Sequence, residues 1–336
     1  MKKSLLALAV LGSFVGAASA QSSLTVFGIV DLSINSVKNG STTIKSMDNN
    51  QLNSNRLGFR GVEDLGGGLT ASFWLEGGMA NDTGNPGGLT FTRRSTASLS
   101  GGFGEIRLGR DYVNSFSTPA GFDAYGANGF ANGSNLYTST AAALGSGAAT
   151  QVRANNMVGY FLPSNLGGVY GSVQVSAGEG VVGNKYIGFR VGYAAGPVDA
   201  SLGFSNTTVA SSDKYKTFNI GGSYNLGVAK LYGFYDQRKF GALKYTTYEL
   251  SAGVPLGQGE FRAAYSKGNA EGGSTSANDA SLFGVEYIYN LSKRTALYTQ
   301  YGRLSNKGAS ALTVGLGTGV AGTASSGYGV GVRHSF

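Results

Sequence analysis

Residues 186–193, YIGFRVGY, alternate strictly between apolar side chains and small or charged ones. One face carries Ile187, Phe189, Val191 and Tyr193, and the other carries Gly188, Arg190 and Gly192. The same period of two recurs in residues 217–226, TFNIGGSYNL, and in residues 282–291, LFGVEYIYNL. Because successive side chains of a β-strand point to opposite faces, these segments predict strands with one apolar and one polar face.

Alternation alone also fits a soluble sandwich, so the number and length of the alternating segments decide between the two architectures. Sixteen segments qualify, and their mean length is close to the roughly 9–11 residues that a tilted strand needs to cross a bilayer. The predicted strands are residues 22–35, 52–63, 68–79, 89–100, 103–111, 153–163, 167–178, 184–195, 197–206, 214–226, 228–239, 244–255, 258–268, 280–291, 294–305 and 326–336.

The connections between these segments alternate between short turns and longer polar loops, including a first long loop at residues 36–51. An even number of strands joined in this way is typical of an outer-membrane barrel. Closure is a physical requirement, because an open sheet edge in hydrocarbon leaves backbone N–H and C=O groups unpaired. We therefore predict an all-β fold, a 16-stranded antiparallel transmembrane β-barrel around an aqueous channel.

The composition excludes several other classes of protein. The chain has 336 residues, 56 of them Gly and none Cys, with 13% charged and 41% hydrophobic residues. This is too apolar for a disordered chain, and it excludes disulfide scaffolds and Cys-ligated metal sites. Outside the N-terminus, no apolar run reaches the about 18 residues that a transmembrane helix needs.

The first 20 residues predict a cleaved signal peptide, with residues 21–336 forming the barrel. Two lysines are followed by an apolar stretch and by small residues at positions 18 and 20, where a signal peptidase reads the chain. Basic residues outnumber acidic ones, 26 to 18, but an exported chain does not meet nucleic acid. We predict no nucleic-acid partner.

Six stretches carry a resemblance to a known family. They are SSLTVFGIVD from Ser22, NRLGFRGVEDLGGGLTASFWLE from Asn55, FTRRSTASLSGGFGEIRLGRDY from Phe91, VRANNMVGYFLPSNLGGVYG from Val152, LSKRTALYTQYGRLSNKG from Leu291 and GVRHSF from Gly331. The chain resembles the Gram-negative, trimeric, sixteen-stranded general porins of the β-proteobacterial type. The resemblance implies passive diffusion of small hydrophilic solutes, a location in the cell outer membrane and a homotrimer. It also implies a second loop, about residues 80–88, that latches a neighbouring protomer.

The resemblance further implies contacts with outer-membrane lipid and lipopolysaccharide. The terminal Phe336 resembles the signal read by the outer-membrane assembly machinery. The segment from about residue 112 to 151 is rich in Gly, Ala, Asn and Ser and is too long for an ordinary hairpin. By resemblance it is the third loop, folded into the lumen, where it narrows the channel. Its predicted acids are Asp111 and Asp123. The alternative is an external loop.

Basic side chains are expected on the barrel wall opposite that loop. Alternation places Arg56 on the lumen face because Leu57 and Phe59 must meet lipid. Alternation also places Arg153 there, because Val158 faces out. Both arginines match wall arginines of the family that the chain resembles.

A third wall position falls within the pair Arg93 and Arg94. Alternation counted from Leu99 turns Arg94 inward, whereas the family pattern favours Arg93. Arg110 also resembles a wall arginine, although its spacing from Leu108 fits only if the strand bulges or ends there. With arginines at the narrowest point and few loop acids, we expect a weak to moderate preference for anions.

Three other functions compete with a general porin. A secreted adhesin or β-solenoid would show a fixed repeat of 20–50 residues, whereas the hairpins of this chain are unequal. A barrel enzyme generally needs a catalytic His, and the only His of the chain, His334, points toward lipid by alternation. We therefore expect no enzymatic activity, and the scattered acids and turn glycines predict no metal and no cofactor. A channel specific for one small anion or sugar remains the alternative, although the sequence has no clear lysine- or aromatic-lined track.

Overall fold

The structure, a computed structural model, describes residues 23–84, 90–209, 214–273 and 276–336. The predicted signal peptide and residues 85–88 of the predicted latching loop lie outside the described residues. None of the described helices is both long and apolar enough to cross a bilayer.

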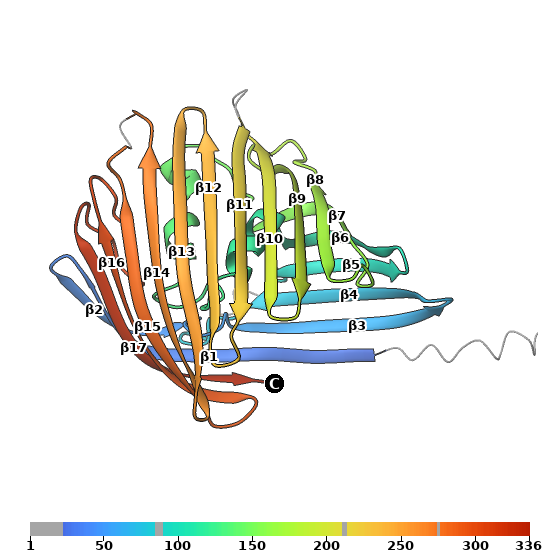
Figure 1. Cartoon of the computed structure of the whole chain (residues 1–336), viewed down its shortest axis with the longest axis horizontal. Helices are drawn as coiled ribbons and strands as arrows, with labels where there is room; N and C mark the ends of the chain where they lie inside the picture. The colour runs from blue at the N-terminus through green and yellow to red at the C-terminus, as the bar shows by residue number, and fades with distance from the viewer. Residues whose placement is uncertain (1–22, 85–89, 210–213, 274–275) are drawn as a thin grey trace, which may run out of the picture.

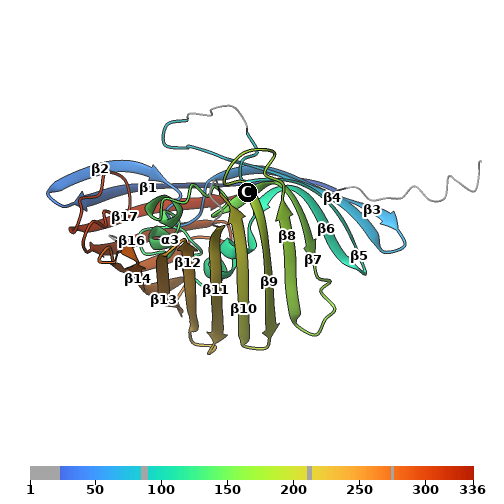
Figure 2. The same cartoon turned by 90° about the horizontal axis from the view of Figure 1, so that it is seen from above.

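The described strands form one closed antiparallel sheet, which winds around an interior that holds three short helices (Figures 1 and 2). The strands are β1 (Ser23–Asn39), β2 (Thr42–Asn49), β3 (Arg56–Gly66), β4 (Leu69–Gly78), β5 (Arg94–Gly101), β6 (Gly104–Tyr112), β7 (Arg153–Phe161), β8 (Val169–Ser176), β9 (Lys185–Ala195), β10 (Val198–Thr208), β11 (Lys214–Asn225), β12 (Lys230–Phe240), β13 (Leu243–Leu256), β14 (Gly259–Glu271), β15 (Ala280–Asn290), β16 (Thr295–Asn306) and β17 (Ala324–Ser335). The helices are α2 (Asn114–Gly121), α3 (Ser134–Tyr137) and α4 (Thr140–Ala143).

Two of the 17 strands share one position in the barrel wall. β2 pairs with the second half of β1, and β3 pairs with the first half of β1. The wall therefore has 17 minus 1, or 16, strand positions, and the pairing of β1 with β17 closes it. This confirms the predicted 16-stranded antiparallel barrel.

The predicted loop at residues 36–51 is wrong. β1 continues to Asn39, and β2 returns beside it after a turn at Gly40, whose φ is 58°. The strand continues because Val37 is buried, and its side chain packs inside the barrel. β2 and β3 are separated at residues 50–55, where the carboxylate of Asp31 accepts the backbone N–H of Leu52 at 2.8 Å.

The apolar face of the alternating strands points away from the barrel interior. In β9, the apolar side chains of residues 187, 189, 191 and 193 are 41–52% exposed on the surface of the isolated chain. The opposite face carries ion pairs along single strands, such as Arg107 with Glu105 at 2.8 Å and Arg238 with Asp236 at 2.7 Å. The apolar face of the strands therefore faces lipid, and the charged face lines the lumen.

The long segment between β6 and β7, residues 113–152, lies inside the barrel and bonds to its wall. We call it the third loop. The Asn114 side-chain amide donates to the carbonyl of Ser172 at 3.1 Å, and the Asn219 amide donates to the carbonyl of Ser115 at 2.7 Å. On the far side, the backbone N–H of Phe130 donates to Gln300 Oε1 at 3.1 Å. These contacts hold the start and the middle of the loop against two different parts of the wall.

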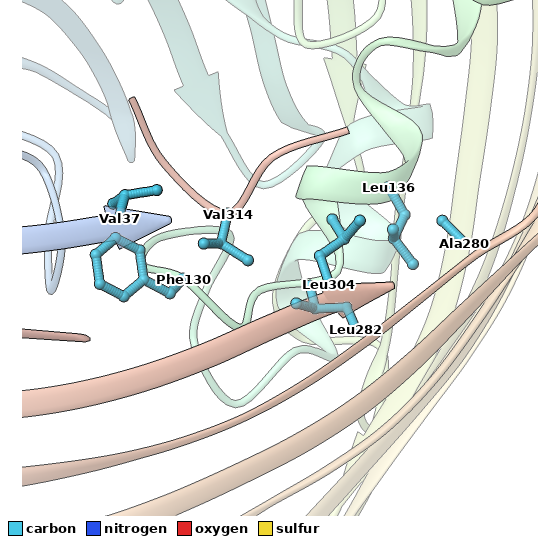
Figure 3. Packing of buried hydrophobic residues seen from close by; sticks show 7 residues of the cluster. All are labelled: Val37, Phe130, Leu136, Ala280, Leu282, Leu304 and Val314. Atoms are coloured by element: carbon cyan, nitrogen blue, oxygen red, sulfur yellow. The ribbon is translucent and has the colours of Figure 1, made fainter. Parts of the chain in front are cut away.

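A buried apolar cluster anchors the third loop (Figure 3). Phe130 and Leu136 of the loop meet side chains from both ends of the chain, namely Val37, Ala280, Leu282, Leu304 and Val314. Three glycines make room for Phe130: a Cβ at Gly315 or Gly327 would lie 3.1–3.2 Å from its ring, and one at Gly302 would lie 2.7 Å from its Cβ. The loop is therefore seated by shape as well as by hydrogen bonds.

The pairing of β6 with β7 contains a bulge. Gly109 pairs with Met157 and Asp111 with Ala154, so two steps along β6 oppose three along β7. The extra residue is accommodated by Asn156, whose φ is 53°, and Gly109 itself has a φ of 121°. A Cβ at Gly109 would lie 2.1 Å from the carbonyl oxygen of Ser95, so this position requires glycine.

We expect Gly109→Ala to lower the free energy of unfolding by about 1–3 kcal/mol, because the new Cβ collides with backbone and the φ is strained. Urea unfolding of the detergent-purified barrel, followed by gel heat-modifiability, measures the change. Gly102→Ala is the matched control, since a Cβ there has nothing within 4 Å. Equal stability of the two variants would contradict the role of the bulge.

We expect Phe130→Ala to destabilise the docked third loop by about 3–5 kcal/mol, because it empties a fully buried ring site. Protease cleavage within residues 113–152 of the purified protein should rise accordingly. Val320→Ala, at a side chain that is 47% exposed, should leave the cleavage rate at the wild-type value. A protease-resistant loop in Phe130→Ala would show that the cluster does not anchor it.

Candidate functional site

Two arginines from neighbouring strands converge on the carboxylate of Glu76, in β4. Arg93, directly before β5, places its Nε 2.6 Å from Glu76 Oε1, and Arg56, at the start of β3, places its Nη1 3.4 Å from the same oxygen. The other carboxylate oxygen accepts the indole N–H of Trp74 at 3.0 Å. Glu76 is nearly buried, and the two arginines remain partly open to the lumen.

Arg153, the first residue of β7, joins this pair from the other side. Its Nε donates to the backbone carbonyl of Arg93 at 2.7 Å, and its guanidinium lies 4.2 Å from the ring centroid of Tyr112. The Tyr112 hydroxyl accepts a hydrogen bond from Arg93 Nη2 at 3.3 Å, and its ring stacks on Phe116 of α2. Arg56, Arg93 and Arg153 are called the arginine cluster below.

The arginine cluster carries an excess of positive charge. Within the described ranges, Glu76 is the one carboxylate that lies within 4.0 Å of any of the three guanidinium groups. Three cations therefore face one anion in this part of the wall. Low-dielectric surroundings focus such a field into the adjacent aqueous space.

The structure separates Arg93 from Arg94, which the sequence left as alternatives. Arg94 points to a different carboxylate, Asp111, at 3.4 Å, and lies against Trp74 at 4.5 Å from the ring centroid. Arg93 belongs to the arginine cluster, and Arg94 lies next to it on the wall. Alternation turns Arg94 inward and the family pattern favours Arg93; in the structure, Arg93 pairs with Glu76 from outside the regular strand, and Arg94 pairs with Asp111.

Asp111 was predicted as an acid of the third loop, and this is wrong. It lies in β6, nearly buried, where it pairs with Arg107 at 2.7 Å and with Arg94. The reason is that β6 extends to Tyr112 before the chain turns into the lumen. Asp111 thus balances wall arginines and leaves the third loop with a single acid, Asp123.

Asp123 lies in the third loop, and its carboxylate serves the loop's own backbone. It accepts the N–H of Tyr125 at 2.8 Å and those of Ala127 and Gly133 at 3.3 Å each. The side chain is almost fully buried, and this burial raises the pKa of the Asp123 carboxyl. The loop meets the wall beside the arginine cluster through a neutral amide instead, since Ser54 Oγ donates to Asn128 Oδ1 at 2.9 Å.

Arg110 stands apart from the arginine cluster. Its Nε donates to the carbonyl of Thr92 at 2.5 Å, and its Nη1 donates to the side chain of Asn155. Both partners are uncharged and lie at the rim of the wall. The bulge that would turn Arg110 inward exists, but its extra residue is in β7, so the spacing of Arg110 from Leu108 is unchanged.

The third loop stands between two polar cavities. One, of about 610 Å³, is lined by Arg93, Asn50 and Asn132 on the side of the long loops. The other, of about 420 Å³, is lined by Tyr232, Arg262 and Arg333 toward the short turns. Asn128 of the loop lines both cavities.

The terminal Phe336 completes the barrel seam. Its N–H donates to the carbonyl of Gly28 at 3.0 Å, and its own backbone oxygen accepts the N–H of Gly28 at 3.1 Å. The ring lies over Gly28, where a Cβ would come within 2.3 Å of it, and remains 45% exposed. The described residues contain no group of three or more His, Cys, Asp or Glu arranged to hold a metal ion.

Alternation predicts Glu76 as an inward-facing acid of the lumen, and the structure brings it against Arg56 and Arg93. Tyr112 is a residue of the site that alternation did not predict, because its partner Arg153 is assigned only after the bulge is counted. For the same reason, the alternation argument that turned Arg153 inward fails, and Ala154 is the buried residue there. Arg153 reaches the cluster from the end of its strand.

Comparison with known proteins agrees with this architecture. The family model described as Gram-negative porin matches residues 7–309. Outer membrane porin protein 32 of Delftia acidovorans is 41% identical over 363 aligned residues, covering all of both chains. Among solved structures, an anion-selective porin from Comamonas acidovorans is 38% identical, with a TM-score of 0.84 over 94% of this chain and 100% of that one.

A more distant structure, the trimer form of OmpT from Vibrio cholerae, shares the fold at 13% identity. Its TM-score is 0.70, covering 94% of this chain and 99% of that one. The family match, the relatives and the closed barrel together indicate a channel of the outer membrane. The chain belongs to the Gram-negative porin family.

Proposed function

We propose that this outer-membrane channel admits small hydrophilic solutes and ions by passive diffusion, with a weak to moderate preference for anions. The third loop, at residues 113–152, forms the constriction, and the arginine cluster forms the opposite wall. The observation that carries the proposal is the imbalance of charge at this point. Three guanidinium groups face one carboxylate, and the single acid of the loop is turned into its own backbone.

The chemistry of the constriction supports the direction of the preference. A guanidinium stays charged at any physiological pH, so the field does not depend on protonation. Arg94, by contrast, shares Asp111 with Arg107 and adds less net charge to the constriction. A relative that is 38% identical is described as an anion-selective porin, in line with this proposal.

The proposed oligomeric state rests on the fold shared with a trimeric structure and on the resemblance of the sequence to trimeric porins. We infer a homotrimer, as in the trimer form of OmpT, with the loop at residues 80–88 as its latch. The described part of that loop is tied to its own protomer, since the N–H of Asn81 donates to Asn49 Oδ1 at 2.9 Å. Cleavage after residue 20, contacts with lipid and lipopolysaccharide, and recognition of Phe336 by the assembly machinery belong to the same proposal.

Removing cations from the cluster should reduce the anion preference. We expect Arg56→Gln and Arg153→Gln each to lower the chloride-to-potassium permeability ratio about two- to fourfold, because one unit charge is lost a few ångströms from the permeating ion. Reversal potentials in a KCl gradient across a planar bilayer measure the ratio. Arg294→Gln, in an exposed turn, should leave it unchanged. A wild-type channel that clearly prefers cations would refute the proposal.

Removing the carboxylate should act in the opposite direction. Glu76→Gln removes the negative charge and keeps one oxygen that can accept from Arg93, while its NH2 group replaces the oxygen that accepts from Trp74. We therefore expect the chloride-to-potassium ratio to rise, by about two- to fourfold. The same reversal-potential measurement tests this, with heat-modifiability on a gel as the check that the barrel has formed. A fall in the ratio would mean that Glu76 does not oppose the cluster.

A further inference from the structure

A second basic site lies beside the arginine cluster, one step nearer the short turns. Trp74 precedes Glu76 by two residues in β4 and so shares its lumen face, closer to the turn at residues 67–68. A cavity of about 340 Å³ opens at this place. Its lining includes Arg60, Trp74, Arg94, Thr25, Thr96 and Ser98.

Arg60, in β3, is the unusual member of the lining. Its side chain is exposed to the lumen, with its guanidinium 5.4 Å from the ring centroid of Trp74 and 5.6 Å from that of Phe27. Across the ranges that the structure describes, no carboxylate lies within 4.0 Å of it. Other lumen arginines, such as Arg107 and Arg262, are paired with glutamates on their own strands. The charge of Arg60 is therefore available to a passing ion.

Arg94 supplies a second, incompletely paired cation to the same cavity. Its Nε is 3.4 Å from Asp111 Oδ2, an oxygen that is already 2.7 Å from Arg107 Nη1. The same Nε donates to the hydroxyl of Thr96 at 3.1 Å, which leaves the Thr96 proton free to be donated. The cavity thus presents two guanidinium groups and at least one hydroxyl donor.

Trp74 fixes the geometry of the pair. Both guanidinium groups lie against its ring system, and its indole N–H is held by Glu76 at 3.0 Å. The ring also contacts Phe27, with centroids 5.1 Å apart. Aromatic surroundings lower the local dielectric and strengthen the attraction between the two arginines and an anion. A rigid support also reduces the entropy lost when that anion is bound.

We propose that Arg60, Trp74 and Arg94 form a second anion-binding step on the periplasmic side of the constriction, suited to small carboxylates. This proposed binding site rests on the proposed anion preference, and it specifies small carboxylates as the class of anion that binds. The planar fork of a guanidinium donates two parallel hydrogen bonds to a carboxylate, which a spherical ion cannot match. A carboxylate that leaves the arginine cluster therefore meets a second fork on the same wall before it reaches the periplasm.

Conductance measurements with two anions test the step. The full-length protein, purified from outer membranes, is compared with its Arg60→Gln and Arg60→Lys variants in planar bilayers under KCl and potassium acetate gradients. We expect Arg60→Gln to lower the acetate-to-potassium permeability ratio about two- to fourfold, because it removes an unpaired charge from the path. Arg60→Lys keeps the charge and loses the fork, so it should keep the chloride ratio and lower the acetate-to-chloride ratio.

Lys230→Gln is the matched control, because Lys230 is a lumen cation of β12 without a carboxylate within 4.0 Å among the described residues. If Lys230→Gln lowered the acetate-to-potassium permeability ratio as much as Arg60→Gln does, the proposed binding site would be overturned, because the loss of total positive charge would then explain both results. An acetate-to-chloride ratio in Arg60→Lys equal to that of wild type would also overturn it. A wild-type channel without anion preference in KCl would instead refute the proposed function, and the step with it.

Discussion

The need to pair every backbone N–H and C=O group within hydrocarbon governs this protein. A sheet satisfies it only by closing on itself, and closure here joins the two ends of the chain, with β1 paired to β17. The last residue extends the seam, because Phe336 exchanges two backbone hydrogen bonds with Gly28. The apolar face of each strand then has to point outward, and this leaves the polar face around the lumen.

A wall of this circumference encloses more space than its side chains fill, and the third loop uses that space. The loop is held by neutral and charged groups: the Asn114 and Asn219 amides bond to backbone carbonyls, Arg238 Nη1 donates to Gln151 Oε1 at 2.8 Å, and Phe130 fills a pocket bordered by glycines. The field at the constriction comes from the arginine cluster together with the neighbouring wall cations Arg60 and Arg94.

The period-two pattern predicted the barrel, its strand number and the lipid face of the regular strands, because burial in lipid is a strong and periodic constraint. It failed where that constraint ends. Residues 36–51 form a hairpin whose strands carry polar residues, and such a polar composition also predicts a loop. The pair Arg93 and Arg94 could not be separated, since Arg93 precedes the regular strand. The bulge opposite Gly109 shifts the count by one residue and hid the contact between Arg153 and Tyr112.

The cluster around Phe130 has a consequence for biogenesis. Its members come from β1, from the third loop and from β15, β16 and the segment that precedes β17, so the C-terminal part of the chain provides most of the seat. Because the chain is synthesised from its N-terminus, these packing residues are missing until the last strands have been made. The channel is therefore narrowed only after the barrel is complete. A chain truncated before its last strands would leave the third loop without the side chains that Phe130 and Leu136 pack against.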